Sequence, residues 1–223
     1  MRVLLIILIL SYFTSTVYSQ SDSTRNDKGA VYLGLELFKP LQWGLQGNST
    51  VIEPELTYQK SNVFYKASFG YANIQSTIYD ELDYQVTGSY LKLGAGVELD
   101  YFFNPDNKSD LLLGANLVFS NFEETGYALF KGNYFEDFNA ELTQNNSSRG
   151  LEAYFAIRKR VSNRLLFLFS ARAAYIFNEL KQDVFPIYYA PGFGVVNVFD
   201  DRSTSNENRM TGGLSIKLEY QLR

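Results

Sequence analysis

The sequence contains neither histidine nor cysteine, and these two absences exclude several kinds of site. Without histidine, the chain lacks the commonest general base and the usual transition-metal ligand, so a histidine-based hydrolase or acyltransferase site cannot be assembled. Without cysteine, it has no disulfide framework, no thiolate nucleophile and no attachment point for a lipoprotein anchor. We therefore expect no enzyme activity, no cofactor and no metal site.

Two further absences bear on partners and location. Lys and Arg number 20 against 24 Asp and Glu, and no basic stripe is present to neutralise phosphates, so we expect no nucleic-acid binding. Beyond the N-terminal region, no apolar stretch approaches the ~20 residues that a helix needs to cross a bilayer. Any membrane span in this chain must therefore be made of strands.

The N-terminal region has the order of an export signal. Arg2 precedes the apolar run at residues 3–10, and a stretch of polar and small residues then continues to Ser19. This order predicts a cleaved signal peptide at residues 1–19 and export of the chain. Residues 20–29 are polar and lack apolar periodicity, which predicts a short disordered lead-in before a barrel domain at residues 30–223.

Alternation of apolar with polar or small residues recurs along the remaining chain. In the clearest segment, Leu91 and Leu93 share one face while Lys92 and Gly94 share the other. Aromatic residues make up 16% of the chain and mean hydropathy is −0.16, a combination that suits alternating strands. The alternating segments are residues 31–37, 52–59, 63–71, 91–103, 111–119, 151–158, 165–177 and 214–222. They predict an all-β fold, an eight-stranded antiparallel up-and-down transmembrane β-barrel.

The connections between these segments differ in length. Short turns are expected at residues 60–62, 104–110 and 162–164, and longer loops at 40–49, 75–87, 120–149 and 178–209. Short turns at one end and long loops at the other are typical of bacterial outer-membrane barrels, whose short turns are periplasmic and whose long loops are extracellular.

The polar faces carry charges of both signs, interleaved with glycine. A narrow eight-stranded lumen is filled by its own side chains, and a lone buried charge there would be costly, so we expect acids and bases to pair across it. The apolar faces would then contact lipid. The predicted lumen charge network consists of Glu36, Glu53, Glu55, Lys66, Lys92, Glu98, Asp100, Glu152, Arg158, Arg172, Lys217 and Glu219.

Alternation alone leaves the orientation of the faces open. A soluble periplasmic lipocalin-like barrel would point its apolar face inward around an apolar ligand, and a membrane barrel with a less crowded lumen would be a narrow solute channel. Aromatic residues near segment ends, including Tyr58, Tyr65, Tyr175 and Tyr220, favour the membrane barrel because they fit interfacial girdles.

Acidic residues are the remaining candidates for chemistry. Glu53 with Glu55 and Glu98 with Asp100 each share a strand face, as a glycosidase acid–base pair would, but such carboxylates in a barrel lumen are far more often salt-bridge partners. In the loops, clustered acids offer either a calcium site or, as we expect, solvated charge. These loop acids are Glu123, Glu124, Glu136, Asp137, Asp200 and Asp201.

The predicted loop at residues 120–149 is rich in aromatic side chains. It holds Tyr127, Phe130, Tyr134, Phe135 and Phe138, more than a plain disordered loop would contain. They form a possible interaction surface, or they fold the loop back over the barrel mouth.

The closing region contains Tyr189-Ala190-Pro191-Gly192-Phe193-Gly194 before the last alternating segment. This element resembles the Tyr-x-Pro-Gly-Phe-Gly sequence of a family of small outer-membrane β-barrel proteins from Bacteroidota. The resemblance implies an outer-membrane barrel without an assigned biochemical role. Pro191-Gly192 itself is expected to form a type II turn.

The expected partners follow from this location. They are outer-membrane lipid, lipopolysaccharide and the barrel-insertion machinery. That machinery usually reads a terminal aromatic residue, whereas this chain ends with Tyr220 followed by three other residues, so Tyr220 is the expected substitute.

Overall fold

The structure is a computed structural model, and it describes residues 29–37, 49–79, 82–99, 109–130, 138–178, 180, 187, 189–196 and 209–222. The predicted signal peptide, residues 1–19, and nearly all of the lead-in, residues 20–29, lie outside these residues. In the described part of the chain, no helix has the length and hydropathy needed to cross a bilayer.

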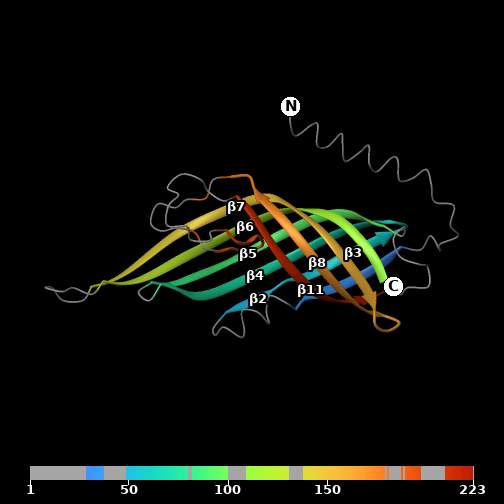
Figure 1. The fold of residues 1–223 in the computed structure, drawn as a ribbon, viewed down its shortest axis with the longest axis horizontal. Helices are drawn as coiled ribbons and strands as arrows, with labels where there is room; N and C mark the ends of the chain where they lie inside the picture. Colours follow the sequence, from blue (N-terminus) through green and yellow to red (C-terminus); the bar gives the residue numbers. More distant parts are fainter. Residues whose placement is uncertain are drawn as a thin grey trace, which may run out of the picture.

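The described residues form strands that coil around a single axis (Figure 1). Their bounds are β1 Ala30–Glu36, β2 Thr50–Ile52, β3 Pro54–Lys60, β4 Val63–Tyr79, β5 Leu82–Glu98, β6 Ser109–Phe130, β7 Phe138–Arg160, β8 Leu165–Ile176, β9 Tyr189–Ala190, β10 Gly194–Val195 and β11 Met210–Gln221.

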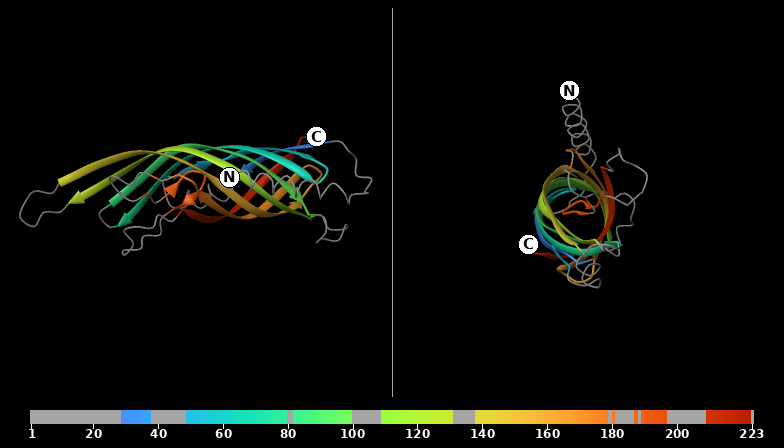
Figure 2. Two further views of the ribbon diagram at one scale, coloured as in Figure 1. Left: turned by 90° about the horizontal axis from the view of Figure 1, so that it is seen from above. Right: turned by 90° about the vertical axis from the view of Figure 1, so that its left-hand side faces the viewer.

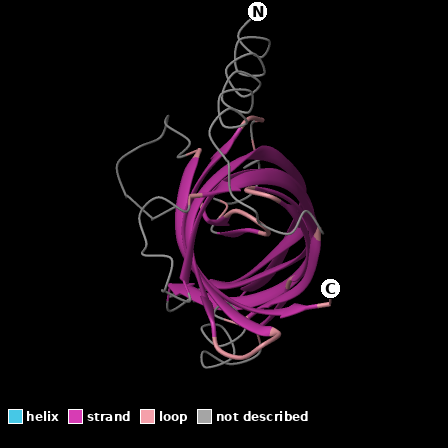
Figure 3. Cartoon of the chain, turned by 90° about the vertical axis from the view of Figure 1, so that its right-hand side faces the viewer, coloured by secondary structure: helices cyan, strands magenta, loops and turns pink. Residues whose placement is uncertain are grey.

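The large sheet is closed. β1 pairs with both β3 and β11, consecutive strands from β3 to β8 pair with one another, and β8 pairs with β11, all antiparallel. Because β2 and β3 both pair with β4, they occupy one position in the wall, which gives the described residues eight strand positions. The view along the axis shows the resulting ring (Figure 3). The predicted eight-stranded antiparallel barrel is confirmed.

Pro54 follows a short break in this wall, and the side chains on either side of the break still alternate between the inside and the outside. It begins β3 directly after the break at Glu53, a position where a proline that lacks an N–H is tolerated. Val51, Glu53 and Glu55 are buried while Ile52 is half exposed, so the alternation continues across the break.

The apolar faces point outward. Their side chains form an exposed ring around the wall, which we call the apolar band, and the charged faces point to the axis. Val63–Tyr71 on β4 is close to the ~9–11 residues of a strand that crosses a bilayer. Members of the band with 40% or more of their surface exposed include Leu33, Leu35, Ile52, Leu56, Phe69, Leu91, Leu93, Leu113, Leu117, Phe119, Phe155, Phe169 and Leu214.

Aromatic side chains lie near the two ends of the band. Tyr58 and Tyr65 face each other across β3 and β4 beside the turn at Ser61, and Tyr220 is exposed on β11. We call this the turn end. Tyr175 and Phe177, whose rings lie 6.1 Å apart, are exposed at the opposite end.

Two predicted loops are wrong. Residues 75–79 and 82–87 belong to the paired strands β4 and β5, and residues 120–130 and 138–149 belong to β6 and β7. These strands project beyond the apolar band, and the hairpin of β6 and β7 reaches furthest (Figures 1 and 2). We call residues 73–79, 82–89, 121–130 and 138–149 the polar extension. On β5, alternation persists there with the apolar residues on the inner face: Tyr84 and Val86 are buried, while Gln85 and Thr87 lie on the outer face. On β7 the inward residues Gln144 and Asn146 remain polar.

A further strand prediction needs correction. The segment predicted at 91–103 forms β5, which begins earlier, at Leu82, and ends at Glu98. Residues 100–108 lie outside the described part of the chain, and so do Asp100 of the predicted network and the end of that segment.

Candidate functional site: an ion-paired lumen and its plug

The interior at the level of the apolar band is ionic. Every second residue of each strand points to the axis, and the inward positions of β1 to β8 and β11 carry most of the chain's buried charges. With the exception of Asp100, the structure brings the predicted network residues into this interior. Their side chains are nearly all less than one-tenth exposed: Glu36, Glu53, Glu55, Lys66, Lys92, Glu98, Glu152, Arg158, Arg172, Lys217 and Glu219.

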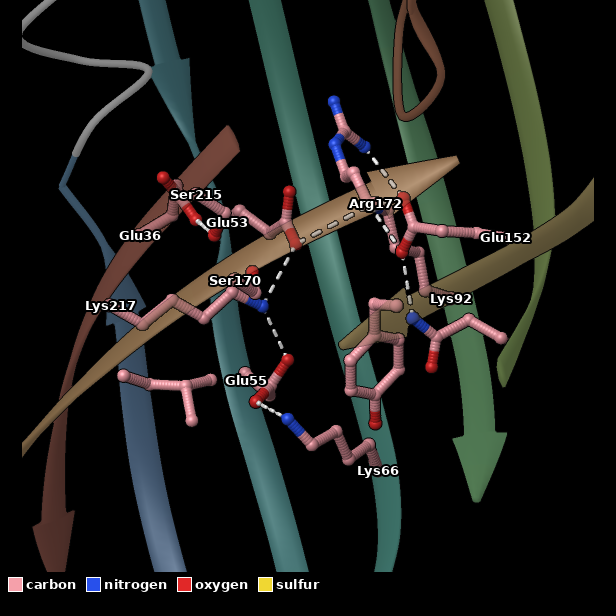
Figure 4. Close-up of a pocket in the computed structure, with 13 residues that line it drawn as sticks. Glu36, Glu53, Glu55, Lys66, Lys92, Glu152, Ser170, Arg172, Ser215 and Lys217 are labelled. Carbon is pink, nitrogen blue, oxygen red and sulfur yellow. Dashed lines mark hydrogen bonds and ion pairs between the residues drawn. The ribbon is translucent and has the colours of Figure 1, made fainter. Parts of the chain in front are cut away.

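Glu55 lies at the centre of this network. Its carboxylate is 3.0 Å from Lys66 Nζ and 2.5 Å from Lys217 Nζ. Lys217 Nζ also lies 3.3 Å from the Glu53 carboxylate, so one ammonium group bridges two carboxylates that are two residues apart in the sequence (Figure 4). Glu53 and Glu55, considered above as an acid–base pair, therefore both belong to ion pairs.

A second group centres on Glu152. It pairs with Lys92 at 3.0 Å and with Arg172 Nη1 at 2.6 Å, and it accepts a hydrogen bond from Asn116 at 2.8 Å. Lys92 lies 3.7 Å from Glu53, which joins the two groups across the lumen. Charges from β3, β5, β7, β8 and β11 thus meet at one level of the barrel.

A third group fills the turn end. Arg158 pairs with Glu98 at 3.1 Å and with Asp110 at 3.0 Å, and its Nη1 donates to Gln59 at 2.9 Å. The guanidinium carbon lies 4.9 Å from the ring centre of Tyr32, a distance that allows a cation–π contact.

Little space remains among these side chains. The cavity lined by the Glu53, Glu55 and Glu152 groups has a volume of about 20 Å³, room for about one water molecule. Close approach is possible because glycine occurs at inward positions: a Cβ on Gly70 would lie 2.0 Å from the Tyr90 ring. At this level the lumen is filled.

The lumen at the other end is closed by a hairpin. β9 and β10 lie inside the ring rather than in its wall (Figures 2 and 3), and we call residues 189–196 the plug. Phe193 N donates to Ala190 O at 3.0 Å, and Gly192 has φ +84°. Proline followed by glycine at positive φ gives the geometry of a type II turn, as expected for Pro191-Gly192.

The plug is held by polar and apolar contacts. Arg172 Nη1 donates to Gly192 O at 2.9 Å, and Thr211 Oγ1 donates to Phe193 O at 3.0 Å. Since Arg172 also pairs with Glu152, its side chain links the plug to the ion network, as does Tyr90, which lies beside Gly192 and donates to Glu53 at 2.6 Å. Its apolar side chains pack against the inner wall in a buried cluster that includes Ile74, Tyr84, Val86, Val118, Phe122, Ile176, Ile187, Tyr189, Ala190, Phe193 and Val196.

One carboxylate lies within this apolar end. Glu124, on the part of β6 beyond the band, is fully buried and accepts hydrogen bonds from Tyr84, from Gln144 at 3.1 Å and from Asn146 at 3.0 Å. Burial raises its pKa to about 7, and these donors only partly oppose that effect. The Tyr84 hydroxyl also accepts from the backbone N of Tyr189, at 3.4 Å, which connects Glu124 to the plug.

The other predicted surface residues divide between the extension and the undescribed segments. Tyr127 is 45% exposed on β6, and Phe130 pairs in register with Phe138 at the end of the hairpin. Tyr134 and Phe135 lie outside the described residues. The prediction of one aromatic loop is wrong, because strands carry three of its five members.

The predicted loop acids are likewise dispersed. Glu123 is exposed on the outer face, Glu124 is buried on the inner face, and the other four lie outside the described residues. Nowhere in the described ranges do three or more acidic side chains converge as a metal site would require.

Sequence reasoning missed the plug and the phase inversion. For the local structure around Pro191 the sequence predicts a turn, and the structure places that turn inside the barrel beside Tyr90 and Arg172. A signal for the extension was present in the alternation of Tyr84 and Val86 with Gln85 and Thr87.

These features define a class: closed eight-stranded antiparallel barrels with an ion-paired lumen, here closed at one end by an internal hairpin. The chain belongs to the DUF6048 family, described as a domain of unknown function, whose model matches residues 1–208. No curated protein shows significant sequence similarity to the chain.

Solved structures with a similar fold have little sequence in common with this chain. CarO of Acinetobacter baumannii is 12% identical, with a TM-score of 0.47 over 88% of this chain and 99% of CarO. Neisserial surface protein A is 11% identical, with a TM-score of 0.44 over 86% and 94% of the two chains. Ail, the attachment invasion locus protein of Yersinia pestis, is 10% identical, with a TM-score of 0.39 over 89% and 100%.

Proposed function

We propose that this protein is a non-enzymatic, non-conducting β-barrel of the bacterial outer membrane, with a structural or surface-interaction role. The observation that carries the proposal is the distribution of polarity across the wall. Leu93 is 44% exposed while the adjacent Lys92 is 4% exposed, and the same contrast recurs around the ring. Lipid stabilises such an outer surface, whereas water would leave a continuous apolar band exposed.

The alternative of a soluble lipocalin-like barrel requires the opposite arrangement. Such a barrel needs an apolar cavity for its ligand. Here the space beside Glu55 and Glu152 is about 20 Å³ and is lined mainly by polar and charged groups, so an apolar ligand has neither room nor partners at this level.

The alternative of a narrow solute channel is disfavoured by two independent barriers. Ion pairs fill the lumen at the level of the apolar band, and the plug fills the end next to the extension. A lumen filled by its own side chains is typical of small barrels, whereas porins of about 16–18 strands leave an aqueous channel.

The proposal has three further parts. Residues 1–19 are a cleaved signal peptide, so the mature chain begins at Gln20. Tyr220, 42% exposed on the last strand, is the residue that the insertion machinery recognises. The Tyr-x-Pro-Gly-Phe-Gly element supports an origin of the chain in the Bacteroidota barrel family.

Cell fractionation tests the location. We expect the protein in the outer-membrane fraction, extractable only by detergent, with a gel mobility that changes on heating and a mature N-terminus at Gln20. Recovery in the soluble periplasmic fraction would refute the membrane proposal. Planar-bilayer recording tests closure, and a stable single-channel current from the purified barrel would refute it.

A further inference from the structure

The two cross-strand rows of outward residues next to the apolar band carry few charges. The first of these rows, at the edge of the apolar band, consists of Tyr71, Ser89, Asn121 and Ser147, which are neighbours in register on β4, β5, β6 and β7. Each of the last three has a neutral side chain that both donates and accepts hydrogen bonds. A water-exposed sheet face usually mixes charges of both signs, so this row is unusual in its chemistry.

The next row continues the pattern. Asn73, Thr87, Glu123 and Asn145 are again neighbours in register, with Glu123 as the one charged member. Thr87 donates to the Asn73 amide oxygen at 3.4 Å, and Asn121, Glu123 and Asn145 are exposed.

Six members of these rows, together with Gly88, Phe122 and Asn146, line an open groove of about 550 Å³. Its volume is within the ~300–1,000 Å³ that small-molecule sites occupy. Small residues of β5 lie between the larger side chains of β4 on one side and those of β6 and β7 on the other. The polar and aromatic residues that line it include Tyr71, Thr87, Ser89, Asn121, Glu123 and Asn145.

We propose that this groove binds the sugar headgroup of a glycolipid in the outer leaflet, the chemistry that lipopolysaccharide presents. The inference rests on the proposed membrane location and adds a site to it. Sugar hydroxyl groups both donate and accept hydrogen bonds, as amide and hydroxyl side chains do, and the ring of Tyr71, 42% exposed, offers an apolar surface for a sugar face.

Continuity with the apolar band identifies the occupant. On β6, Phe119 is 42% exposed in the band, and Asn121 is the next outward residue. The groove therefore begins two residues along β6 from the last apolar residue of the band, at the depth of the lipid headgroups. The only charge in it is the Glu123 carboxylate, which repels phosphate, so the groove selects the sugar hydroxyls of the headgroup rather than its phosphates.

The test uses the full mature barrel in phospholipid nanodiscs. The probe is the delipidated saccharide of purified lipopolysaccharide, and the dissociation constant is measured by surface plasmon resonance. The double variant Asn121→Ala/Asn145→Ala removes two amide groups from the groove. We expect it to weaken saccharide binding about tenfold or more, since each lost hydrogen bond contributes to affinity.

The matched control is Asn163→Ala. Asn163 is an exposed asparagine in the turn between β7 and β8, at the turn end of the barrel, and its substitution should leave the dissociation constant within about twofold. Unchanged heat-modifiable mobility in both variants shows that they fold.

Three results would overturn the inference: no saccharide binding by the wild type, equal binding by the double variant and the wild type, or binding only of intact lipopolysaccharide with its acyl chains. Each of these outcomes leaves the membrane location intact if the protein still fractionates with the outer membrane. A soluble protein would instead refute the proposed function on which the inference rests.

Discussion

Glu124 should make the stability of this barrel depend on pH in a range where few of its other side chains titrate. The carboxylate is fully buried, and its neighbours from β5 and β7 are the neutral donors Tyr84, Gln144 and Asn146. The chain has no histidine and no cysteine, so groups with ordinary pKa values stay in one protonation state between about pH 5.5 and 7.

The sign follows from the direction of the pKa shift. Burial raises the pKa of Glu124 from 4.5 to about 7, so the folded protein holds this proton more tightly than the unfolded chain. The stabilisation is complete below about pH 4.5 and is lost as the pH rises through 7. The whole shift corresponds to about 3 kcal/mol, of which about 2 kcal/mol falls between pH 5.5 and 8.5.

Glu124→Gln is the perturbation that tests this reasoning, because it removes the charge and keeps the shape. The assay is the free energy of unfolding of the detergent-solubilised barrel in urea, measured by gel mobility and circular dichroism across pH 5.5 to 8.5. We expect the wild type to lose about 2 kcal/mol more than E124Q over this range. Glu123→Gln, a change at the exposed neighbour, is the control and should behave as the wild type does.

Two results would refute the reasoning. One is a wild-type stability that does not fall between pH 5.5 and 8.5 relative to E124Q. The other is an equal change in E123Q, which would assign the effect to general surface charge rather than to the buried carboxylate.

Three other substitutions test the plug, the lumen and the band. Gly192→Ala places a Cβ at φ +84° and 2.9 Å from Tyr90, so the free energy of local opening of the plug should fall by about 1–2 kcal/mol. Hydrogen exchange of the plug amides should accelerate accordingly, whereas Gly212→Ala should have little effect. Lys217→Met leaves two buried carboxylates without their shared ammonium group and should lower the free energy of unfolding by about 3–5 kcal/mol, whereas the exposed Lys159→Met should change it by less than about 0.5 kcal/mol. Leu93→Arg, in the apolar band, should cost about 2–4 kcal/mol in lipid vesicles, and Thr125→Arg, in the extension, about 0–1 kcal/mol; equal costs at the two sites would contradict a lipid-covered band.

Sequence alone predicted the barrel and the direction of its faces because alternation is a local property. Leu91 and Leu93 must point away from Lys92 in any extended strand, and the mixture of charges with glycine on the second face favoured the interior for that face. The number of strands follows from the same pattern, since each strand position in the barrel wall corresponds to one alternating segment of the sequence.

The polar extension does not follow from the sequence pattern when the apolar residues are assumed to stay on one face of each strand. At Tyr90 on β5 that face moves from the outside of the wall to the inside, so outward residues become polar and the segment resembles a loop. Counting alternation of either phase would have extended β5 back to Tyr84, whose burial beside Val86 is consistent with the inverted pattern.

The plug could not be predicted in this way, because its contacts are not local. Its turn needs only Pro191 and Gly192, but its position depends on Tyr90, Arg172 and Thr211, which come from three other strands. Nothing in the spacing of these residues along the chain indicates that they meet inside the ring.

The phase inversion also explains why the barrel is closed by two different chemistries. At the level of the apolar band many inward positions carry charges, and ion pairs such as that of Glu55 with Lys217 occupy the lumen beside an apolar cluster that includes Phe64 and Leu168. Beyond the band, inward positions such as Ile74 on β4 and Val86 on β5 are apolar, and apolar side chains of the plug such as Phe193 pack against them. The two fillings are joined through Arg172 and through Tyr90, which lies beside Gly192 and donates to Glu53 at 2.6 Å. Because the ion pairs of Glu55 with Lys66 and Lys217 include no plug residue, loosening the plug should leave the ion-paired layer, and with it the barrier to ions, in place.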